Sequence, residues 1–395
     1  MDVVNESFDS PVTGDPIPLL WLYGPPGVGK STVGWQFFSQ LTRDETRIGY
    51  LDIDQLGMCY PAPVSDPDRH RIKAQNLGAM VTGFEAGGAQ CVLVSGVVDE
   101  IHGVRNYVGQ IPQTVLTLCR LRAHRDVLAA RLAYRGLGPS QVASMLRELD
   151  ILNRGEVSDL SIDTSGLTVA EVIQCLREKT GAWPALTRRA SPPNSQTSVT
   201  NGPTVRPIPG SILWICGATG VGKSTVGWRV FEKVRCAGVT AAFVDLEQIG
   251  FFRPVPGDDP ENHRIKAHNL AGLWWTFHGS GARCLIVVGP VNDIDTLRTY
   301  RDALPGTTLK LCRLHAGSVQ LAHRIKLRGQ GFGPKIPGDA LNGKPLETLH
   351  QIARRAAATA DALQHEALGD LCIDTDGLTV EEAAQKIMDQ IDGWP

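Results

Sequence analysis

A chain of 395 residues is long enough for two or three domains. Its composition, 42% hydrophobic with a formal net charge of −2, allows real cores and argues against a polyanion-binding surface. Residues 1–18 are polar and have neither the basic nor the apolar region of a secretion signal, and no apolar run approaches the roughly 18 residues of a membrane span. We therefore expect a cytoplasmic protein that begins with a disordered tail at 1–18 and has no membrane partner.

The sequence repeats itself on the scale of a whole domain. From about residue 19 to 138, features of the first half recur 193 positions later without a gap, as Trp21 and Trp214 do. Beyond that region the offset becomes 211, because the second copy carries 18 extra residues. A repeat of this length predicts a duplicated domain rather than a solenoid. The expected domains are 19–184 and 211–395.

Each copy begins with an apolar run, the pattern G-x-x-x-x-G-K-S and a helical segment. This is the setting of a phosphate-binding P-loop, in which backbone N–H groups and a helix N-terminus surround a phosphate. The motif lysine reaches the outer phosphates and the serine binds Mg²⁺. The expected nucleotide-binding residues are Gly24, Gly27, Val28, Gly29, Lys30 and Ser31 in the first copy and Gly217, Gly220, Val221, Gly222, Lys223 and Ser224 in the second.

The second predicted strand, 48–54, ends in the acids Asp52 and Asp54, which recur as Asp245 and Glu247. Side chains two residues apart on a strand share a face, and the carboxyl end of a parallel strand faces the ligand crevice. One acid could orient Mg²⁺ or accept a proton while its neighbour binds the acceptor. A solvated strand end is the alternative, but recurrence beside a P-loop favours a functional pair.

A polar, basic helix start follows, in which Asp66 and Pro67 predict the N-cap and the first helical residue. Its first turn could hold an anionic or hydroxylated acceptor, although an exposed helix start with ordinary charges would look the same. The candidate acceptor-binding residues are Arg69, His70 and Lys73 in the first copy and His263 and Lys266 in the second. Because Asn262 stands where the first copy has Arg69, the two acceptors could differ.

The next predicted strand, 91–97, is continuously apolar, which is typical of a strand covered on both faces. No acid stands directly at its end, and this absence argues against a motor-type ATPase. Four cysteines recur within such runs, and we expect them to be small buried hydrophobic residues in a reducing cytosol rather than metal ligands. They are Cys91, Cys119, Cys284 and Cys312.

Arginine pairs four residues apart precede a flexible Gly-x-Gly in both copies and share one helix face. They could close over ATP and neutralise transition-state charge, or they could simply form a solvated basic helix end. The pairs are Arg131 with Arg135 and Arg324 with Arg328. The 18 extra residues of the second copy follow this point, so we expect a longer lid there, over 332–344.

The two copies are separated by residues 185–210, which are rich in Pro, Ser, Thr and Asn. Such a segment cannot bury enough apolar surface to order itself, so we expect a disordered linker. A coil of this length would span about 25–30 Å. The copies could therefore work independently or dock as an intramolecular pseudo-dimer, and the sequence leaves both arrangements open.

Together these features resemble the small P-loop kinases of the shikimate, gluconate and adenylylsulfate kinase group. The resemblance covers nearly all of each copy and includes a terminal strand that ends at Asp163-Thr164. The D-x-D pattern and Asp68-Arg69-His70-Arg71 look most similar to adenylylsulfate kinase, but its D-G-D and its D-R-x-x-N-I-R-R run are absent, so its substrate is not carried over. The resemblance implies two three-layer α/β/α P-loop NTPase domains of the kinase type, each with a five-stranded parallel sheet.

The same resemblance implies transfer of the γ-phosphoryl group of ATP, with Mg²⁺, to a small-molecule acceptor. It places Thr32 and Thr225 beside the α-phosphate. It implies that Asp52 and Asp245 contact the metal or act as a base, and that Asp54 and Glu247 hold the acceptor.

The sequence allows three functions. The first is a tandem Mg·ATP-dependent small-molecule kinase. The second is a nucleotide-gated switch or slow ATPase, which the duplication itself suggests because it could pair two nucleotide sites. The third is a nucleic-acid end kinase, against which the balanced charge and the lack of a basic stripe speak.

Overall fold

The computed structural model describes residues 16–97, 107, 111, 114–152, 159–181, 183–184, 207–333, 338–391 and 393–394. Most of the predicted tail and linker therefore lies outside the described residues. At the edges, the first strand begins at Ile17, two residues earlier than expected. Residues 207–210, assigned to the linker, contact the second copy: Ile208 is buried, and its N–H donates to the Pro305 carbonyl.

The first copy alternates strands and helices. Its strands are β1 (Ile17–Tyr23), β2 (Ile48–Asp52), β3 (Cys59–Tyr60), β4 (Cys91–Ser95), β5 (Thr114–Arg122) and β6 (Leu160–Asp163). Its helices are α1 (Lys30–Arg43), the 3₁₀ turn η1 (Ile53–Gly57), α2 (His70–Ala86), α4 (Arg125–Tyr134), α5 (Pro139–Leu152) and α6 (Val169–Lys179). Helix α1 buries Val33, Phe37 and Leu41 at helical spacing, as the sequence predicts.

The second copy repeats this order. Its strands are β7 (Ser211–Cys216), β8 (Ala241–Asp245), β9 (Phe252–Arg253), β10 (Cys284–Val288), β11 (Thr308–His315) and β12 (Leu371–Asp374). Its helices are α7 (Lys223–Cys236), α8 (His263–Gly279), α9 (Ile294–Ala303), α10 (Ser318–Gly329), α11 (Leu346–His365) and α12 (Val380–Gln390). Helix α11 has 20 residues where α5 has 14, so part of the extra length of this copy is helical.

Each copy contains five parallel strands, which confirms the predicted fold class. The sheet orders are β6-β5-β1-β4-β2 and β12-β11-β7-β10-β8, with all neighbours parallel. The central strands are buried on both faces, because helices cover both sides of the sheet. The carboxyl ends of β1 and β2, where the P-loop and the first acid lie, therefore meet at one edge.

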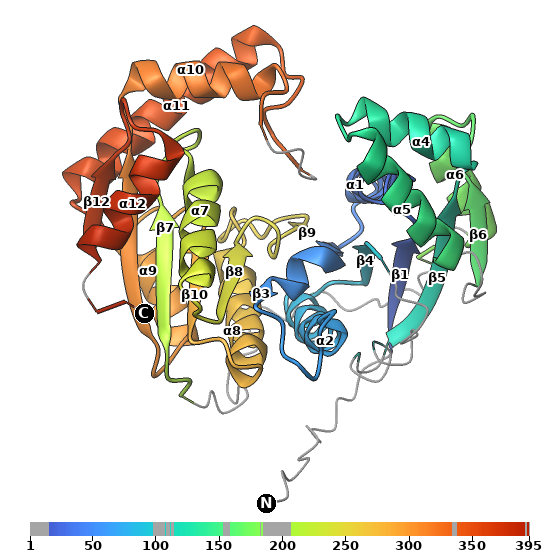
Figure 1. Ribbon diagram of the computed structural model, residues 1–395, viewed down its shortest axis with the longest axis horizontal. Coiled ribbons are helices and arrows are strands. Elements are labelled where there is room, and N and C mark those ends of the chain that lie inside the picture. Colours follow the sequence, from blue (N-terminus) through green and yellow to red (C-terminus); the bar gives the residue numbers. More distant parts are fainter. Residues whose placement is uncertain are drawn as a thin grey trace, which may run out of the picture.

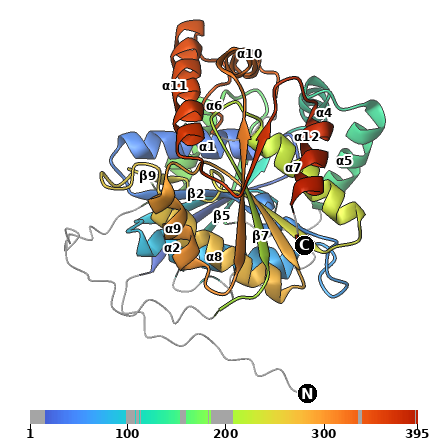
Figure 2. The ribbon, with the colours of Figure 1, turned by 90° about the vertical axis from the view of Figure 1, so that its left-hand side faces the viewer.

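The sequence did not predict a sixth strand in each sheet, and each copy receives it from the other. Strand β9 pairs antiparallel with β2, and β3 pairs antiparallel with β8 (Figures 1 and 2). Neighbouring backbone bonds extend the exchange: the Tyr50 N–H donates to the Phe251 carbonyl at 2.8 Å, and the Phe243 N–H to the Met58 carbonyl at 2.9 Å. The edge strand of each sheet is thus covered by the partner copy.

Helices α2 and α8 pack against each other between the two sheets (Figure 1). They approach closely: a Cβ on Gly83 would lie 1.9 Å from the Asn269 amide oxygen, and one on Gly272 would lie 2.9 Å from the Ala79 Cβ. One apolar core includes buried residues of both copies, among them Trp21 and Trp214. The halves therefore share a core on this side. On the other side each half has its own core, to which the partner copy adds Phe251 in the first half and Met58 and Tyr60 in the second.

Two further predictions concern the whole chain. The four recurring cysteines are buried and unpaired, as expected for small apolar residues, and they are Cys91, Cys119, Cys284 and Cys312. Burial raises the pKa of the Cys119 thiol to about 12. Among the described helices, none combines the length and apolar character needed to cross a bilayer.

Candidate active sites

The loop after β1 has the backbone geometry that the P-loop pattern predicts. Gly24 has φ +147°, and a Cβ there would lie 2.3 Å from the Leu121 carbonyl oxygen, so only glycine fits. Gly29 is the N-cap of α1 in the left-handed region, and no side chain caps the helix. The first N–H groups of α1 are thus available to an anion. Gly217 and Gly222 repeat both features in the second copy.

The motif lysines curl back over their own loops. The Lys30 ammonium donates to the carbonyls of Gly24 at 2.8 Å and Pro25 at 3.0 Å. Lys223 donates in the same way to Gly217 and Ala218, at 2.8 and 3.0 Å. Burial lowers the pKa of Lys30 to about 8 and also lowers the pKa of Lys223. Two neutral carbonyls are weak partners for a buried cation, so an incoming phosphate would bind these lysines favourably.

Each motif serine meets the acid at the end of the next strand. The Ser31 hydroxyl donates to the Asp52 carboxylate at 3.0 Å, and the Ser224 hydroxyl to Asp245 at 2.9 Å. Burial raises the pKa of both carboxyl groups. A hydroxyl and a buried carboxylate are oxygen ligands that suit Mg²⁺. The described residues contain no group of three or more His, Cys, Asp or Glu side chains that could hold a metal, so phosphate and water oxygens would have to complete the coordination.

The second acid of each pair is not on the strand. Strand β2 ends at Asp52, and Asp54 lies in the turn η1, where its N–H donates to the Asp52 carboxylate at 3.0 Å. Glu247 makes the same bond to Asp245. The premise that both acids share one strand face is therefore wrong, because the chain turns immediately after the first acid. Both acids nevertheless stay next to the strand end.

These second acids pair with the predicted lysines of the acceptor helix. The Lys73 ammonium lies 3.3 Å from the Asp54 carboxylate, and the Lys266 ammonium lies 2.7 Å from Glu247. The two lysine side chains are largely buried, while the two acids are about half exposed. One carboxylate face thus remains open toward solvent beside a fixed positive charge.

The acceptor helix begins later than predicted. Helix α2 starts at His70, after Arg69 takes a left-handed conformation with φ 60°. The Asp66 carboxylate still accepts hydrogen bonds from the N–H groups of Arg71 and Ile72, so it caps the helix from outside. The expected N-cap is thus wrong in position, although the aspartate does satisfy the free N–H groups of the first turn.

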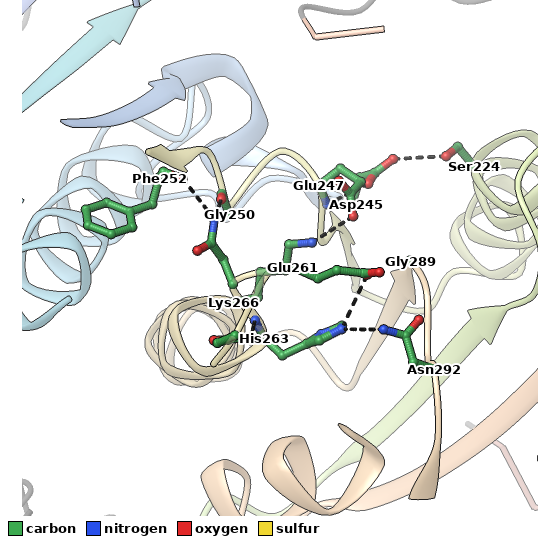
Figure 3. Close-up of polar contacts among 12 residues, drawn as sticks. Ser224, Asp245, Glu247, Gly250, Phe252, Glu261, His263, Lys266, Gly289 and Asn292 are labelled. Carbon is green, nitrogen blue, oxygen red and sulfur yellow. Dashed lines mark hydrogen bonds and ion pairs between the residues drawn. The ribbon is translucent and has the colours of Figure 1, made fainter. Parts of the chain in front are cut away.

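The two predicted histidines each bond to a buried tyrosine. His70 Nδ1 lies 3.2 Å from the Tyr107 hydroxyl, and His263 Nδ1 lies 3.1 Å from that of Tyr300. Figure 3 shows the other nitrogen of His263 facing Asn292 at 3.3 Å and the Glu261 carboxylate at 3.4 Å. In the first copy, the Asp68 carboxylate is 3.9 Å from His70. The histidines are therefore fixed in orientation beside the acid–lysine pairs.

Position 69 has a different surrounding in each copy. The Arg69 guanidinium lies over the Tyr60 ring, 4.3 Å from its centroid. Asn262 is buried and donates to the carbonyls of Gly250 and Phe252. Each side chain contacts the loop of its own copy that carries the exchanged strand. The change from Arg to Asn therefore accompanies the different loop contacts of the two copies. Binding of the acceptor by Arg69 stays a prediction.

The lid arginines divide into two kinds. Arg131 donates to the Val28 carbonyl at 3.3 Å and to both the hydroxyl and the carbonyl of Thr164. Arg324 makes the matching bonds to Val221 and Thr375. These guanidinium groups tie the P-loop to the end of the last strand. Thr164 thus anchors an arginine, a role that the sequence did not indicate.

The second arginine of each pair lies near the P-loop lysine. The charge of Arg135 contributes to the lowered pKa of Lys30, and the charge of Arg328 acts similarly on Lys223, although burial is the main cause in both. Arg328 also donates to the Asp339 carboxylate at 3.0 Å, within the predicted lid. The rest of that lid includes residues 334–337, which lie outside the described residues.

Sequence reasoning missed some residues of these sites. Tyr107 and Tyr300 recur at the repeat offset, a pattern that a surface helix and a substrate contact explain about equally well, and the structure shows that both are buried and contact the histidines. Asn292 has Asp99 at its counterpart position, so the repeat gave no signal for it. Thr32 and Thr225, predicted beside the α-phosphate, are exposed in the first turns of α1 and α7.

No protein-family model matches this chain, and no curated protein matches it. Solved structures do match. A tunicamycin resistance protein of Deinococcus radiodurans is 22% identical with a TM-score of 0.33, covering 47% of this chain and 97% of its own. A gluconokinase from Sinorhizobium meliloti 1021 is 17% identical with a TM-score of 0.32, covering 47% and 92%. The Mycobacterium tuberculosis APS kinase CysC, in complex with AMPPNP and APS, is 20% identical with a TM-score of 0.29, covering 46% and 98%. Each likeness concerns the fold alone and spans about half of this chain.

Proposed function

We propose that each copy binds Mg·ATP and transfers its γ-phosphoryl group to a hydroxyl or phosphate of a small acceptor. One observation carries the proposal. In both copies, the P-loop lysine and serine, the strand-end acid, the acid–lysine pair and the fixed histidine follow one another from the phosphate loop to the acceptor helix. A site that only held a nucleotide would not need the acid–lysine pair and the fixed histidine.

In the proposed reaction, the loop N–H groups and the motif lysine bind the phosphates. The serine and the strand-end acid, Ser31 with Asp52 and Ser224 with Asp245, would hold Mg²⁺, which supplies charge neutralisation when bound. Arg135 and Arg328 would neutralise negative charge that builds up on the moving group. Arg131 and Arg324 donate to groups of the protein itself and would keep the P-loop in place, while Arg135 and Arg328 act on the phosphates.

Acceptor residues would align the attacking oxygen. That oxygen forms a bond to the γ-phosphorus, the bond between this phosphorus and the β–γ bridging oxygen breaks, and ADP leaves with the electron pair. With a hydroxyl acceptor, the open carboxylate of Asp54 or Glu247 would accept the proton directly or through water. Lys73, Lys266 and the histidines would fix the acceptor, so that positioning and charge supply the catalysis.

We also infer that the two halves form an intramolecular pseudo-dimer in the cytosol and act without nucleic acid. The reciprocal strands β3 and β9 and the close packing of α2 on α8 support the first statement. Buried unpaired cysteines suit a reducing compartment, and a net charge of −2 does not suit a polyanion. Paired copies also keep a nucleotide-gated switch or slow ATPase as the alternative function.

The direct test measures ADP release from Mg·ATP with and without a pooled extract of small metabolites, while mass spectrometry watches for new phosphate esters. We expect release to rise with the extract and a phosphorylated metabolite to appear, and both to vanish in the Lys30→Ala, Lys223→Ala double variant. ADP release that ignores the extract, with no new ester, would favour the switch or ATPase.

A further inference from the structure

The first copy surrounds its strand-end acid with a buried chain of hydroxyl groups. The Ser95 hydroxyl donates to the same Asp52 oxygen that Ser31 contacts, at 3.3 Å, and it lies 2.9 Å from the Tyr50 hydroxyl. Ser95 and Tyr50 are fully buried. The Asp52 carboxylate is thus held by one hydroxyl from the P-loop and one from strand β4.

The second copy lacks this chain altogether. At the repeat offset of 193 residues, Tyr50 becomes Phe243 and Ser95 becomes Val288, so both hydroxyls are lost together. The joint loss has a physical reason, because a buried hydroxyl without its partner is costly. Asp245 keeps its bond to Ser224 and is paired across the sheet with the apolar Val288. The two copies therefore support equivalent acids in different ways.

The Tyr50 ring also touches the second copy. The backbone N–H of Tyr50 donates to the Phe251 carbonyl at 2.8 Å, and the centroids of the two rings lie 6.0 Å apart. Trp35 of helix α1 completes the group, with ring centroids 4.8 Å from Phe251 and 5.7 Å from Tyr50. Two residues of the first copy thus hold one aromatic ring supplied by the second.

A second segment of the second copy rests on the same group. A Cβ on Gly338 would lie 2.8 Å from the Trp35 ring and 3.0 Å from the Phe251 ring. The next residue, Asp339, pairs with Arg328 beside the nucleotide lysine of the second copy. A continuous series of contacts therefore runs from the Arg328 region of one site to Asp52 of the other.

The reverse connection is different. The counterpart of Phe251 is Met58, and Trp228, the counterpart of Trp35, is 38% exposed and packs on Phe231 and Phe243 of its own copy. The series of contacts also ends at Phe243, which has no hydroxyl to pass on to Asp245. In the reverse direction, the Tyr60 ring of the first copy packs 6.1 Å from the Phe231 ring of the second, but no hydroxyl leads from these rings to Asp245. Only the series from the second copy to the first therefore reaches a strand-end acid.

We propose that Tyr50 and Ser95 position Asp52 for Mg²⁺ in the first copy, and that the second copy sets this position through Phe251 and Gly338. This inference rests on the proposed Mg·ATP function. Tyr50 and Ser95 act through Asp52 and are positioning residues rather than catalytic ones. Loss of a comparable supporting partner costs about 10- to 100-fold in metal affinity elsewhere.

The first test reads the first copy alone, in a Lys223→Ala background, by titrating Mg²⁺ against binding of a fluorescent ATP analogue. Tyr50→Phe is expected to raise the half-maximal Mg²⁺ concentration about 10-fold and to leave Mg²⁺-free nucleotide affinity unchanged. Ser95→Ala should do the same, and Ser95→Thr should restore the wild-type value. In the Lys30→Ala background, which reads the second copy, Tyr50→Phe should change nothing.

The second test concerns the contact between copies. In the Lys223→Ala background, Phe251→Leu keeps an apolar side chain but removes the ring, and it should raise the Mg²⁺ requirement of the first copy about threefold. Trp228→Phe, an aromatic change confined to the second copy, is the matched control and should have no effect there.

The outcomes separate the two levels of the account. If the wild-type protein binds no nucleotide, both the proposed function and this inference are wrong. If nucleotide binds but Tyr50→Phe and Ser95→Ala leave the Mg²⁺ requirement unchanged, the positioning role is wrong while the proposed function stands. If those variants act as expected but Phe251→Leu does not, the contribution of the second copy is overturned.

Discussion

The P-loops of the two copies make the same lysine and serine contacts, whereas the residues packed behind them differ. Both lysines donate to two loop carbonyls at 2.8 and 3.0 Å, and both serines contact a strand-end acid. Around that acid, however, the first copy has Tyr50 and Ser95 where the second has Phe243 and Val288. Backbone geometry fixes the phosphate loop, so the loop repeats, while the packing behind it is free to diverge.

The acceptor sides differ in a second way. The first copy places Arg69 on Tyr60, while the second buries Asn262 under the exchanged strand and adds Asn292 beside His263. The acid–lysine pair remains in both. The comparison teaches that the two sites keep the same lysine, serine and acid contacts but differ in the side chains around the start of the next helix.

The largest effect should come from the motif lysines, which test whether both copies work. If the proposed function holds, Lys30→Ala and Lys223→Ala should each lower phosphoryl transfer at their own copy by on the order of 100-fold or more, because each would remove a charge from the transferring phosphate. The measurement is acceptor-dependent ADP release by each single variant. If one variant keeps full activity and the other loses all of it, the copies are not equivalent catalysts.

Gly83→Ala tests whether the copies depend on each other for stability. Its Cβ would meet the Asn269 side chain across the α2–α8 contact, so we expect a loss of about 1–3 kcal/mol in the free energy of unfolding. Gly279→Ala is the matched control, since nothing lies within 4 Å of its Cβ. Urea titration followed by circular dichroism measures both, and equal midpoints for the two variants would contradict a tight contact.

The recurring cysteines should behave alike in both copies. Burial raises the pKa of Cys119 and of Cys284 to about 12, so these thiols should resist iodoacetamide at pH 8 while the exposed Cys236 and Cys372 react. Peptide mass spectrometry, with and without denaturant, measures the pattern. Rapid labelling of Cys119 in the folded chain would contradict this burial.

The same thiols give a pH dependence with a definite sign. Their folded pKa lies above the unfolded value near 9, so the unfolded chain loses the proton first. Their contribution to stability is complete below pH 9 and declines as the pH rises toward 12. The melting temperature should therefore be lower at pH 10 than at pH 8. The difference should be smaller in a Cys119→Ala, Cys284→Ala variant.

The smallest effect should come from an ion pair found in the second copy. Glu381 contacts Arg229 and Lys233, which lowers its pKa to about 2. The counterpart of Glu381 in the first copy is Ala170. Because the group is exposed, Glu381→Gln should lower the melting temperature only slightly, and high salt should remove the difference. The contribution of Glu381 to stability should be present above pH 4.5 and lost as the pH falls toward 2. A large shift that resists salt would contradict this account.

Much of each copy was predictable from local pattern. Continuous apolar runs gave β1 and β4, and the G-x-x-x-x-G-K-S pattern gave the loop, the lysine and the serine, because these depend on neighbouring residues. Local sequence also accounts for the starts of the terminal helices, where Thr168 and Thr379 form capping boxes with the glutamate three residues later. The turn after Asp52 was not predictable, because a 3₁₀ segment of five residues leaves no periodic signal.

The contact between copies could not be predicted for the same reason. Strands β3 and β9 contain two residues each, too few to show an alternating pattern, and their partners lie 181 to 205 positions away in the sequence. The left-handed Arg69, which delays helix α2, is also unusual for a residue other than glycine. Local rules thus reproduced the phosphate side of each site and missed the features that tertiary packing decides.

The most direct test of the account is the number of non-hydrolysable ATP analogues bound per chain with Mg²⁺, measured by isothermal titration calorimetry. Two complete sites predict a stoichiometry of two for the wild-type chain, and one for each of the single variants Lys30→Ala and Lys223→Ala. A wild-type stoichiometry of one or zero would contradict the claim that both copies are nucleotide sites.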